Sequence, residues 1–377
     1  MSPDSPHLVE VVRGGLVECL HRARVVVTDA NGEVLASLGD VTSPMFSRSS
    51  LKPVQAIAML RHGLDLDGEL LALAAASHSG QDIHLRGVQQ ILDGAGLGPG
   101  DLRNTPDLPL NEAARADWLR AGRDAEPLAQ NCSGKHAAML RTCVRAGWDT
   151  ASYLEPDHPL QQAIAATVEE YCGGHTPASI DGCGAPLFAT PLQGLAAAFG
   201  RLAAASTGVE QRVADAYRQH PEYVSGQGRG DRALHRAVPG LVCKEGAEGC
   251  LAVGLPDGRG LALKVDDGAT RGSVPLAATI LQAMVDAPDV AGLVTGPVLG
   301  HGRPVGVVRV QPGALDELPG RRAGMIQPLL SPVRPLCAGQ LPAFPAAARN
   351  THPSSPHPLP ARHHRSCACL EAGAAAA

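Results

Sequence analysis

A serine and a lysine three residues apart are the sharpest chemical signal, in the segment Ser49-Ser50-Leu51-Lys52-Pro53. At a helix start, residues i and i+3 share a face, so the Ser49 hydroxyl and the Lys52 amine are expected to be neighbours. Pro53 fixes the start near Ser49, because α-helices tolerate proline only in the first turn. There the helix dipole would stabilise an oxyanion. The pattern predicts acyl transfer with Ser49 as nucleophile and Lys52 as base. A capping serine beside a solvated lysine is the alternative.

A lysine base must be neutral part of the time, which sets a condition on Lys52. Its pKa must fall from about 10.4 toward about 7–8, through burial or a neighbouring cation. Another lysine, Lys264, lies within the apolar run Ala262–Val265. It is either a protective charge on an edge strand or a second active-site lysine facing the helix that carries Ser49.

Three further motifs place polar groups beside helices or turns. They are Ala76-Ser77-His78-Ser79-Gly80-Gln81, Asn131-Cys132-Ser133-Gly134-Lys135-His136 and Asp181-Gly182-Cys183-Gly184-Ala185-Pro186. The first ends an Ala-rich helix, where small polar residues usually serve as caps. The second is not a phosphate-binding loop, because Ala129 and His136 stand where glycine and Ser or Thr are required. It indicates either an anion or metal site at a helix N-terminus or a tight turn with a buried cysteine. The third is typical of a loop.

The glycine-rich stretch Gly226–Asp231 imitates a nucleotide-binding loop. No strand is expected before it and its last spacing is wrong, so we assign it no function. Its Arg-Gly-Asp is expected to be incidental.

The elements that position these residues follow from apolar periodicity. Strands are predicted at 8–12, 23–28, 33–37, 241–244, 250–255 and 260–265. Helices are predicted at about 50–63, 67–77, 84–95, 136–146, 159–171, 191–205, 208–219 and 274–286. Asn31-Gly32 between two apolar runs signals a hairpin. With strands at both ends and helices between, the sequence predicts an α+β fold, in which one antiparallel sheet packs against a helical middle.

The chain has 377 residues, 44% of them hydrophobic and 3% aromatic, with a net charge of −5. This length suits one large domain or two ordinary ones, and the scattered charge argues against a nucleic-acid or polybasic membrane surface. We expect no signal peptide and no transmembrane helix. Ten irregularly spaced cysteines then predict reduced thiols and a cytoplasmic location.

The composition changes near Leu330, where periodicity gives way to Pro, Ala, His and Ser. We predict one catalytic domain over 1–330 and a low-complexity, disordered tail over 331–377. The tail's His363-His364-Arg365-Ser366-Cys367-Ala368-Cys369 could bind a metal, but a low-complexity end is the favoured interpretation.

In their order along the chain, the motifs resemble the asparaginase II family, the Rhizobium-type or class 3 L-asparaginases. The matching segments begin at Arg13-Gly14-Gly15-Leu16-Val17-Glu18, include the motifs at Ser49, Ser77, Cys132 and Asp181, and end at Lys264-Val265-Asp266-Asp267-Gly268. The likeness runs from about residue 8 to 315, and the family-like body finishes near Arg309.

The resemblance implies a fold like that of serine β-lactamases and glutaminases, and hydrolysis of L-asparagine to L-aspartate and ammonia. It implies two Ser-Lys pairs, which map onto Ser49 with Lys52 and Ser77 with Lys264. It implies a zinc ion held by Cys132, Lys135 and Cys183, substrate-binding roles for Arg48, His136 and Asp181, and a homodimer. No organic cofactor is expected.

Three other functions compete with this one. A β-lactamase or D,D-peptidase would share the Ser-x-x-Lys motif, but Ser-Asp-Asn and Lys-Thr-Gly motifs are missing from the sequence. A glutaminase on the same scaffold is separable only by substrate kinetics. A non-catalytic zinc- or amino-acid-binding relative is disfavoured because both Ser-Lys pairs are present.

Overall fold

The computed structural model describes residues 5–174, 176–316 and 318. The chain divides into two units, Met1–Leu329 and Leu330–Ala377, and the described residues all belong to the first. The predicted tail at 331–377, with its His-Cys cluster, lies outside them.

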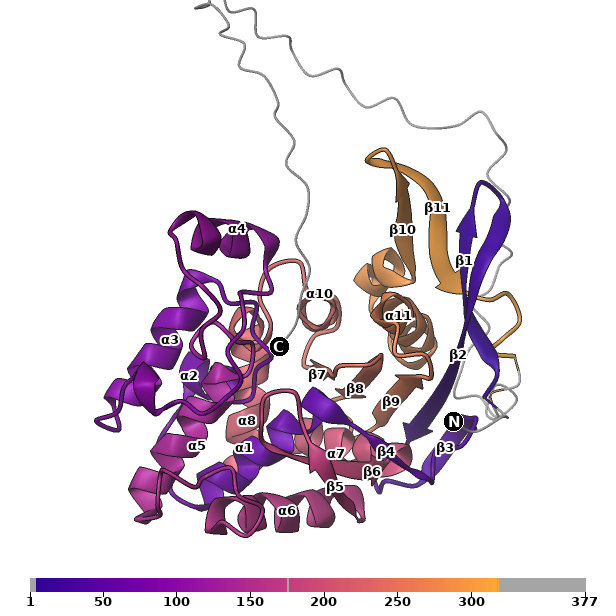
Figure 1. Cartoon of the computed structure of the whole chain (residues 1–377). Coiled ribbons are helices and arrows are strands. Elements are labelled where there is room, and N and C mark those ends of the chain that lie inside the picture. The colour runs from indigo at the N-terminus through magenta and orange to yellow at the C-terminus, as the bar shows by residue number, and fades with distance from the viewer. Residues whose placement is uncertain (1–4, 175, 317, 319–377) are drawn as a thin grey trace, which may run out of the picture. The chain divides into compact units, whose positions relative to one another are not determined.

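The first unit alternates strands and helices in an order that leaves most helices in the middle of the chain (Figure 1). The strands are β1 (His7–Arg13), β2 (Leu16–Thr28), β3 (Val34–Leu38), β4 (Pro44–Phe46), β5 (Thr176–Ile180), β6 (Pro186–Pro191), β7 (Val242–Glu245), β8 (Cys250–Gly254), β9 (Gly260–Val265), β10 (Thr295–Gly300) and β11 (Arg303–Val310). The α-helices are α1 (Lys52–Arg61), α2 (Gly68–Ala74), α3 (Asp82–Asp93), α4 (Glu112–Arg120), α5 (Ser133–Ala146), α6 (Pro159–Cys172), α7 (Leu192–Ala204), α8 (Gly208–Gln219), α9 (Pro221–Val224), α10 (Gly230–Ala237) and α11 (Ser273–Met284). The 3₁₀ turns are η1 (Arg48–Leu51), η2 (Pro99–Asp101), η3 (Thr270–Gly272) and η4 (Pro288–Leu293).

One antiparallel sheet joins the two ends of the described chain. Its strand order is β10-β11-β1-β2-β9-β8-β7, and β3 pairs with β2. The N-terminal β1 lies between β2 and the late strand β11, with Val9 opposite Val310. The predicted α+β class, with an antiparallel sheet built from both chain ends, is confirmed (Figure 1). The described residues also form a smaller, three-stranded sheet in the order β4-β6-β5.

The main sheet has a hydrophobic core on each face. Alternate residues of β7, β8 and β9 point to opposite faces, because side chains in a strand alternate. Val242, Ala252 and Ala262 join the larger core with α1, α6 and α7. Their neighbours Cys243 and Leu251 join the second core, which includes α10 and α11. Burial on both faces explains why these strands read as continuous apolar runs.

Several elements escaped prediction for identifiable reasons. The small sheet begins or ends at prolines such as Pro44, Pro186 and Pro191, which argue against strands in a sequence. Helix α10 starts at Gly230, inside the glycine-rich stretch that was interpreted as loop. The predicted helix at 50–63 begins instead with η1 and continues as α1.

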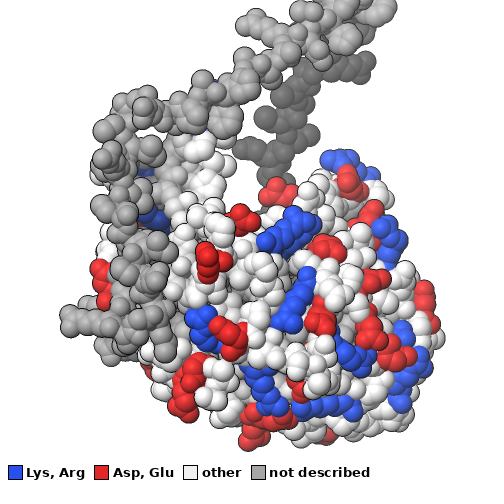
Figure 2. Space-filling view, turned by 180° about the vertical axis from the view of Figure 1, so that it is seen from behind, with Lys and Arg blue, Asp and Glu red and all other residues white. Residues whose placement is uncertain are grey.

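The surface carries mixed charge. Lys and Arg are interspersed with Asp and Glu over the face seen in Figure 2, as the composition predicts. Within the described ranges, no helix combines the length and apolar character needed to cross a membrane.

Candidate active site

Ser49 lies on a bend between β4 and α1. The preceding residue, Arg48, has a backbone φ of +49°, which is uncommon for a residue with a side chain and is frequent at functional sites. Pro53 occupies the first turn of α1, as expected, and fixes where the helix begins. Ser49 is partly exposed, whereas Ser50 is buried and its hydroxyl donates to the Lys244 carbonyl at 3.3 Å. Ser49 is therefore the accessible hydroxyl of this bend.

Gly246 allows the end of β7 to pack against this bend. A Cβ atom at Gly246 would lie 2.7 Å from the Ser50 hydroxyl and 2.8 Å from the Ser47 carbonyl. Both distances are shorter than real contacts, so only glycine permits the approach. The close packing brings Lys244, two residues earlier, next to the segment that carries Ser49.

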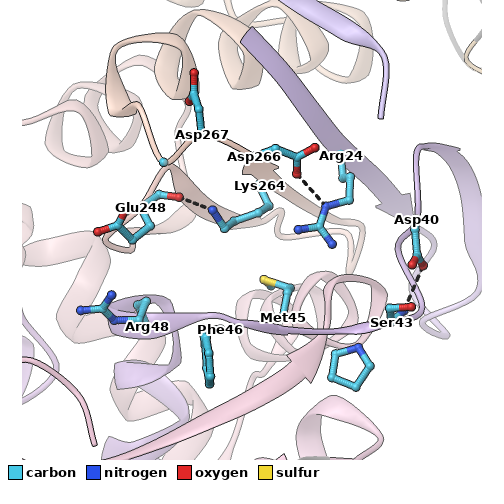
Figure 3. A pocket seen from close by; sticks show the side chains of 12 residues that line it. Arg24, Asp40, Ser43, Met45, Phe46, Arg48, Glu248, Lys264, Asp266 and Asp267 are labelled. Atoms are coloured by element: carbon cyan, nitrogen blue, oxygen red, sulfur yellow. Dashed lines mark hydrogen bonds and ion pairs between the residues drawn. The ribbon is translucent and has the colours of Figure 1, made fainter. Parts of the chain in front are cut away.

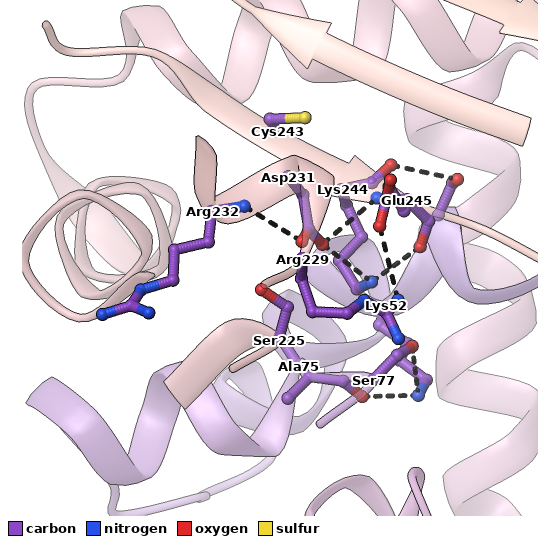
Figure 4. Close-up of polar contacts among 12 residues, drawn as sticks. Lys52, Ala75, Ser77, Ser225, Arg229, Asp231, Arg232, Cys243, Lys244 and Glu245 are labelled. Carbon is purple, nitrogen blue, oxygen red and sulfur yellow. Dashed lines mark hydrogen bonds and ion pairs between the residues drawn. The ribbon is translucent and has the colours of Figure 1, made fainter. Parts of the chain in front are cut away.

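Lys52 is buried at the centre of the site. Its Nζ donates to the Ser77 hydroxyl at 3.0 Å (Figure 4). It also donates to the Ala76 carbonyl at 2.5 Å and lies 3.1 Å from Cys132 Sγ. Among the described side chains, no hydrogen bond joins Lys52 to Ser49. Lys52, the expected partner of Ser49, therefore contacts Ser77, which was expected to pair with Lys264.

The Lys52 amine has the electrostatic setting that a base requires. Burial lowers its pKa most; the Cys132 sulfur opposes this, and the charges of Lys135 and Lys244 lower the pKa further. A lowered pKa is the direction expected for a lysine that acts as a base. The neighbouring cation on the sheet is Lys244, not Lys264.

Lys244 is a fully buried lysine near the end of β7. Its Nζ donates to the Glu245 carbonyl at 2.6 Å and lies 3.5 Å from Asp231 Oδ2, and both side chains are 0% exposed. Burial alone would raise the pKa of Asp231, but the charges of Lys244 and Arg229 outweigh it, and the pKa is lowered. Asp231 therefore holds Lys244 in place as a charged pair (Figure 4).

Lys264 is placed elsewhere, which corrects two expectations. Its Nζ donates to the carbonyls of Glu248 at 2.5 Å and Val265 at 2.8 Å. It lines a separate pocket with Arg24 and Asp266, which form an ion pair at 3.1 Å (Figure 3). The predicted Ser77–Lys264 pair is not formed. Nor does Lys264 protect a sheet edge, since β9 lies between β2 and β8.

Ser49 and Ser77 open into one cavity of about 380 Å³. Asn131, Gly246 and Ser273 also line it. This volume lies in the range of small-ligand pockets and suits an amino acid. The loop bearing Ser77 is fixed by backbone bonds from Ser77 N to the Val224 carbonyl at 3.1 Å and from His78 N to the Asn131 carbonyl at 3.0 Å.

The three predicted metal ligands, Cys132, Lys135 and Cys183, lie together and are buried. Lys135 Nζ is 3.2 Å from Cys183 Sγ. A hydrogen bond from the Cys132 thiol, followed by the Lys135 charge against the opposing effect of burial, lowers the pKa of Cys183 to about 4. The same bond and burial raise the pKa of Cys132 to about 12. Cys183 is therefore the thiolate of this cluster at neutral pH, whereas Cys132 is a thiol.

These residues fit a zinc ion. Two sulfurs and an amine are a zinc-type donor set, and the Lys135–Cys183 separation is close to the roughly 3.5 Å expected across a tetrahedral zinc. His136 beside them has a buried Nε2 without a hydrogen-bond partner among the described residues, while its Nδ1 lies 2.9 Å from the Tyr153 hydroxyl. The described residues contain no metal-binding group made of three or more His, Cys, Asp or Glu, so the donor set here depends on Lys135.

The predicted substrate-binding residues Arg48, His136 and Asp181 surround this cluster. Arg48 Nε donates to Asp181 Oδ1 at 2.8 Å. Lys135 and Arg48 outweigh burial and lower the pKa of Asp181. None of the three is among the residues that line the cavity of Ser49. Their placement fits support of the Cys-Lys-Cys cluster better than contact with substrate.

Sequence reasoning missed Lys244 and Asp231. Lys244 ends the apolar run from Leu241, so it carried the same signal that was used for Lys264. Asp231 belongs to the Arg-Gly-Asp triplet that was judged incidental. Asp231 is buried because α10 packs against β7.

Comparisons with solved structures give distant matches. A β-lactamase from Mycobacterium bovis is 18% identical, with a TM-score of 0.36, and the match covers 66% of this chain and 88% of that one. A penicillin-binding protein homolog from Caulobacter crescentus is 14% identical, with a TM-score of 0.32, over 66% of this chain and 87% of that one. The structure titled Mglu in its tris and glutamate form is 17% identical, with a TM-score of 0.32, over 73% of this chain and 61% of that one.

A search among curated proteins found no match. The family model of L-asparaginase II matches residues 9–310, from the second residue of the predicted first strand to the last residue of β11. That range contains Ser49, Lys52, Ser77 and the Cys-Lys-Cys cluster. The chain therefore belongs to the L-asparaginase II family and is an amidohydrolase.

Proposed function

We propose that this protein hydrolyses L-asparagine to L-aspartate and ammonia by Ser-Lys acyl chemistry. The observation that carries the proposal is the contact of buried Lys52 with Ser77 in a site where Ser77 and Ser49 share one cavity. The family match supports the amide as the bond attacked.

Ser49 is the nucleophile in this proposal. It is the partly exposed serine, it follows the strained Arg48, and it lies in the first turn of the helical run η1–α1, whose dipole favours an oxyanion. Lys52, one turn along, accepts the Ser49 proton as Oγ attacks the amide carbon. Burial and neighbouring positive charge keep the lysine a usable base.

Ser77 then serves the leaving group. It is 3% exposed and bonded to Lys52, so it suits proton relay better than attack. The tetrahedral intermediate collapses, the C–N bond breaks, and the proton taken by Lys52 passes through Ser77 to the departing nitrogen. Water then attacks the Ser49 ester and gives up a proton to Lys52. The ester C–O bond breaks, L-aspartate is released, and Lys52 returns the proton to Ser49 Oγ. Lys244 replaces Lys264 as the second lysine of this mechanism.

Cys132, Lys135 and Cys183 would hold zinc, with Lys135 deprotonated and both cysteines as thiolates. Such an ion would polarise or position polar groups beside it. Arg48 and Asp181 would keep the cluster oriented, since ligand-supporting residues fix ligand geometry. A homodimer in the cytoplasm completes the proposal, on the strength of the family resemblance and the reduced cysteines.

Ammonia release from L-asparagine and L-glutamine tests the reaction, using the full chain and its Ser49→Ala variant. We expect release from asparagine, and a loss of at least about 10³-fold in the variant. Stability should change by only about 1 kcal/mol, the usual contribution of a serine at a helix start. Release from glutamine alone would support a glutaminase, hydrolysis of nitrocefin alone a β-lactamase, and asparagine binding without turnover a non-catalytic relative.

Metal analysis tests the zinc site apart from activity. Purified protein should contain about one zinc per chain, and Cys183→Ser should contain at most a tenth of that. Cys172→Ser is the matched control, because Cys172 is an equally buried cysteine in α6. Equal zinc in both variants would remove Cys183 from the ligand set.

A further inference from the structure

A second cavity, of about 650 Å³, lies on the other side of the loop that borders the candidate active site. Gly228, Arg229, Gly230, Glu245 and Thr270 line both cavities, so they form the shared wall. The second cavity has no part in the chemistry proposed above. Its wall is unusual because it gathers arginines from several segments.

Four arginines line this cavity: Arg229, Arg232, Arg236 and Arg271. Among the described residues, the carboxylates that line it are Glu245 and Asp289, which leaves a formal excess of two positive charges within that set. Two of the four arginines lie one turn apart on α10, a third just precedes that helix and the fourth comes from η3. Clustered guanidinium groups repel one another, so such a wall is stable only with compensating anions or full hydration.

The carboxylates do not neutralise the cluster. Glu245 is engaged by Arg229 at 3.3 Å. Asp289 is exposed, and the described residues give it no ion pair. Arg271 Nε donates to His21 Nε2 at 2.9 Å, and His21 Nδ1 lies 2.5 Å from Asp267 Oδ2.

Two arginines of α10 have no acidic partner within the described ranges. Arg232 has its Nε atom buried without any hydrogen-bond partner there. Arg236 is exposed, and no ion pair is formed by its side chain there. A buried guanidinium N–H without an acceptor costs free energy, and neither arginine has an acidic partner there that would compete with an anion.

We propose that this cavity binds a small dianion, of the phosphate or dicarboxylate type, through Arg232, Arg236 and Arg271. Guanidinium groups bind both classes by paired N–H donors, and the volume lies within the range of small-ligand sites. The site is distinct from the Ser49 cavity, and its existence does not depend on the proposed reaction.

Isothermal titration calorimetry on the full chain tests the site, with inorganic phosphate and succinate as probes at constant ionic strength. We expect saturable binding of at least one probe, weakened at least tenfold in the Arg232→Gln/Arg236→Gln double variant. Arg86→Gln is the control, because Arg86 is an exposed arginine on α3 outside this cavity. Binding of phosphate alone or succinate alone assigns the class.

The single variant Arg236→Gln keeps the test decisive if the double variant fails to fold, since Arg236 is exposed. It should weaken binding at least threefold. Absence of saturable binding by either probe, or equal affinity in the wild type and the α10 variants, overturns the proposal. Because the readout is binding, failure of ammonia release would leave this result unaffected.

Discussion

Lys244 and Lys264 are two lysines of one sheet, and only one reaches the candidate active site. Ala252 of β8 lies opposite both Lys244 of β7 and Ala262 of β9. Ala262 and Lys264 are two residues apart, so both lysines point to the same face. They are nevertheless two strands apart, about 10 Å, and offset along the strands.

Lys244 and Lys264 differ in environment because different segments cover the two ends of the sheet face that they share. Lys244 lies under the bend of Ser49, is 0% exposed and pairs with Asp231. Lys264 pairs with Cys250 in the strand register and lines the pocket of Figure 3, where its Nζ donates to the backbone carbonyls of Glu248 and Val265. A lysine in an apolar strand is thus a sound functional signal, but strand register and the packing of distant segments decide which lysine matters.

Exchanging each lysine for methionine gives the largest expected contrast. Lys244→Met should lower kcat for L-asparagine by about 10²–10⁴-fold, since it removes a buried cation that depresses the Lys52 pKa. Lys264→Met should change kcat less than threefold. Steady-state ammonia release by both variants, each checked for folding by circular dichroism, makes the comparison.

The reverse ranking, with the larger loss in Lys264→Met, would restore the original Ser77–Lys264 pairing. Similar large losses of kcat in both variants would indicate that both lysines contribute to catalysis. Lys264→Arg then separates charge from position, because arginine keeps the charge but not the geometry.

The buried pair itself should be essential to stability when only one partner is removed. Asp231→Asn leaves the Lys244 charge buried without a counter-charge, so we expect a loss of about 3–5 kcal/mol in the free energy of unfolding. Urea denaturation measures it. The double variant Asp231→Asn/Lys244→Met should recover much of that loss, because no unpaired charge remains. Additive losses would mean that the pair contributes no coupling.

The sequence predicts this molecule best where local pattern decides. Periodicity located β1, β3, β7, β8 and β9 and most of the helices, but it missed β10 and β11. Pro53 located the start of the helix after Ser49. Cys132, Lys135 and Cys183 also come together, but they join distant segments and were expected from the family resemblance, not from a local pattern.

The missed features depend on contacts between distant segments. Asp231 meets Lys244 because α10 packs on β7, and no local property of Arg-Gly-Asp announces that burial. Lys52 meets Ser77 because the loop after α2 passes over α1, which crossed the expected pairs. Helix α10 itself was hidden because its first residue is a glycine.

The exposed ion pairs of Asp65 contrast with the buried Asp231–Lys244 pair, and their loss should have the smallest effect on stability. Asp65 accepts from Arg141 at 2.6 Å and Arg145 at 2.9 Å, and its side chain is 43% exposed. The hydrogen bond from Arg141 outweighs burial and lowers the pKa of Asp65 to about 2. A carboxyl whose folded pKa is depressed contributes stability above its unfolded value of about 3.9, and that contribution is lost as pH falls toward 2.

Solvent screening limits this contribution, so Asp65→Asn should cost at most about 1 kcal/mol at pH 7. The difference between wild type and variant should shrink between about pH 4 and pH 2, because protonation removes the same charge from the wild type. Urea denaturation of both proteins at pH 7 and pH 3 measures the change. A loss at pH 7 as large as that of Asp231→Asn would show that burial does not separate the two pairs, whereas the expected small loss assigns the difference in their free energies to desolvation of the Asp231–Lys244 pair.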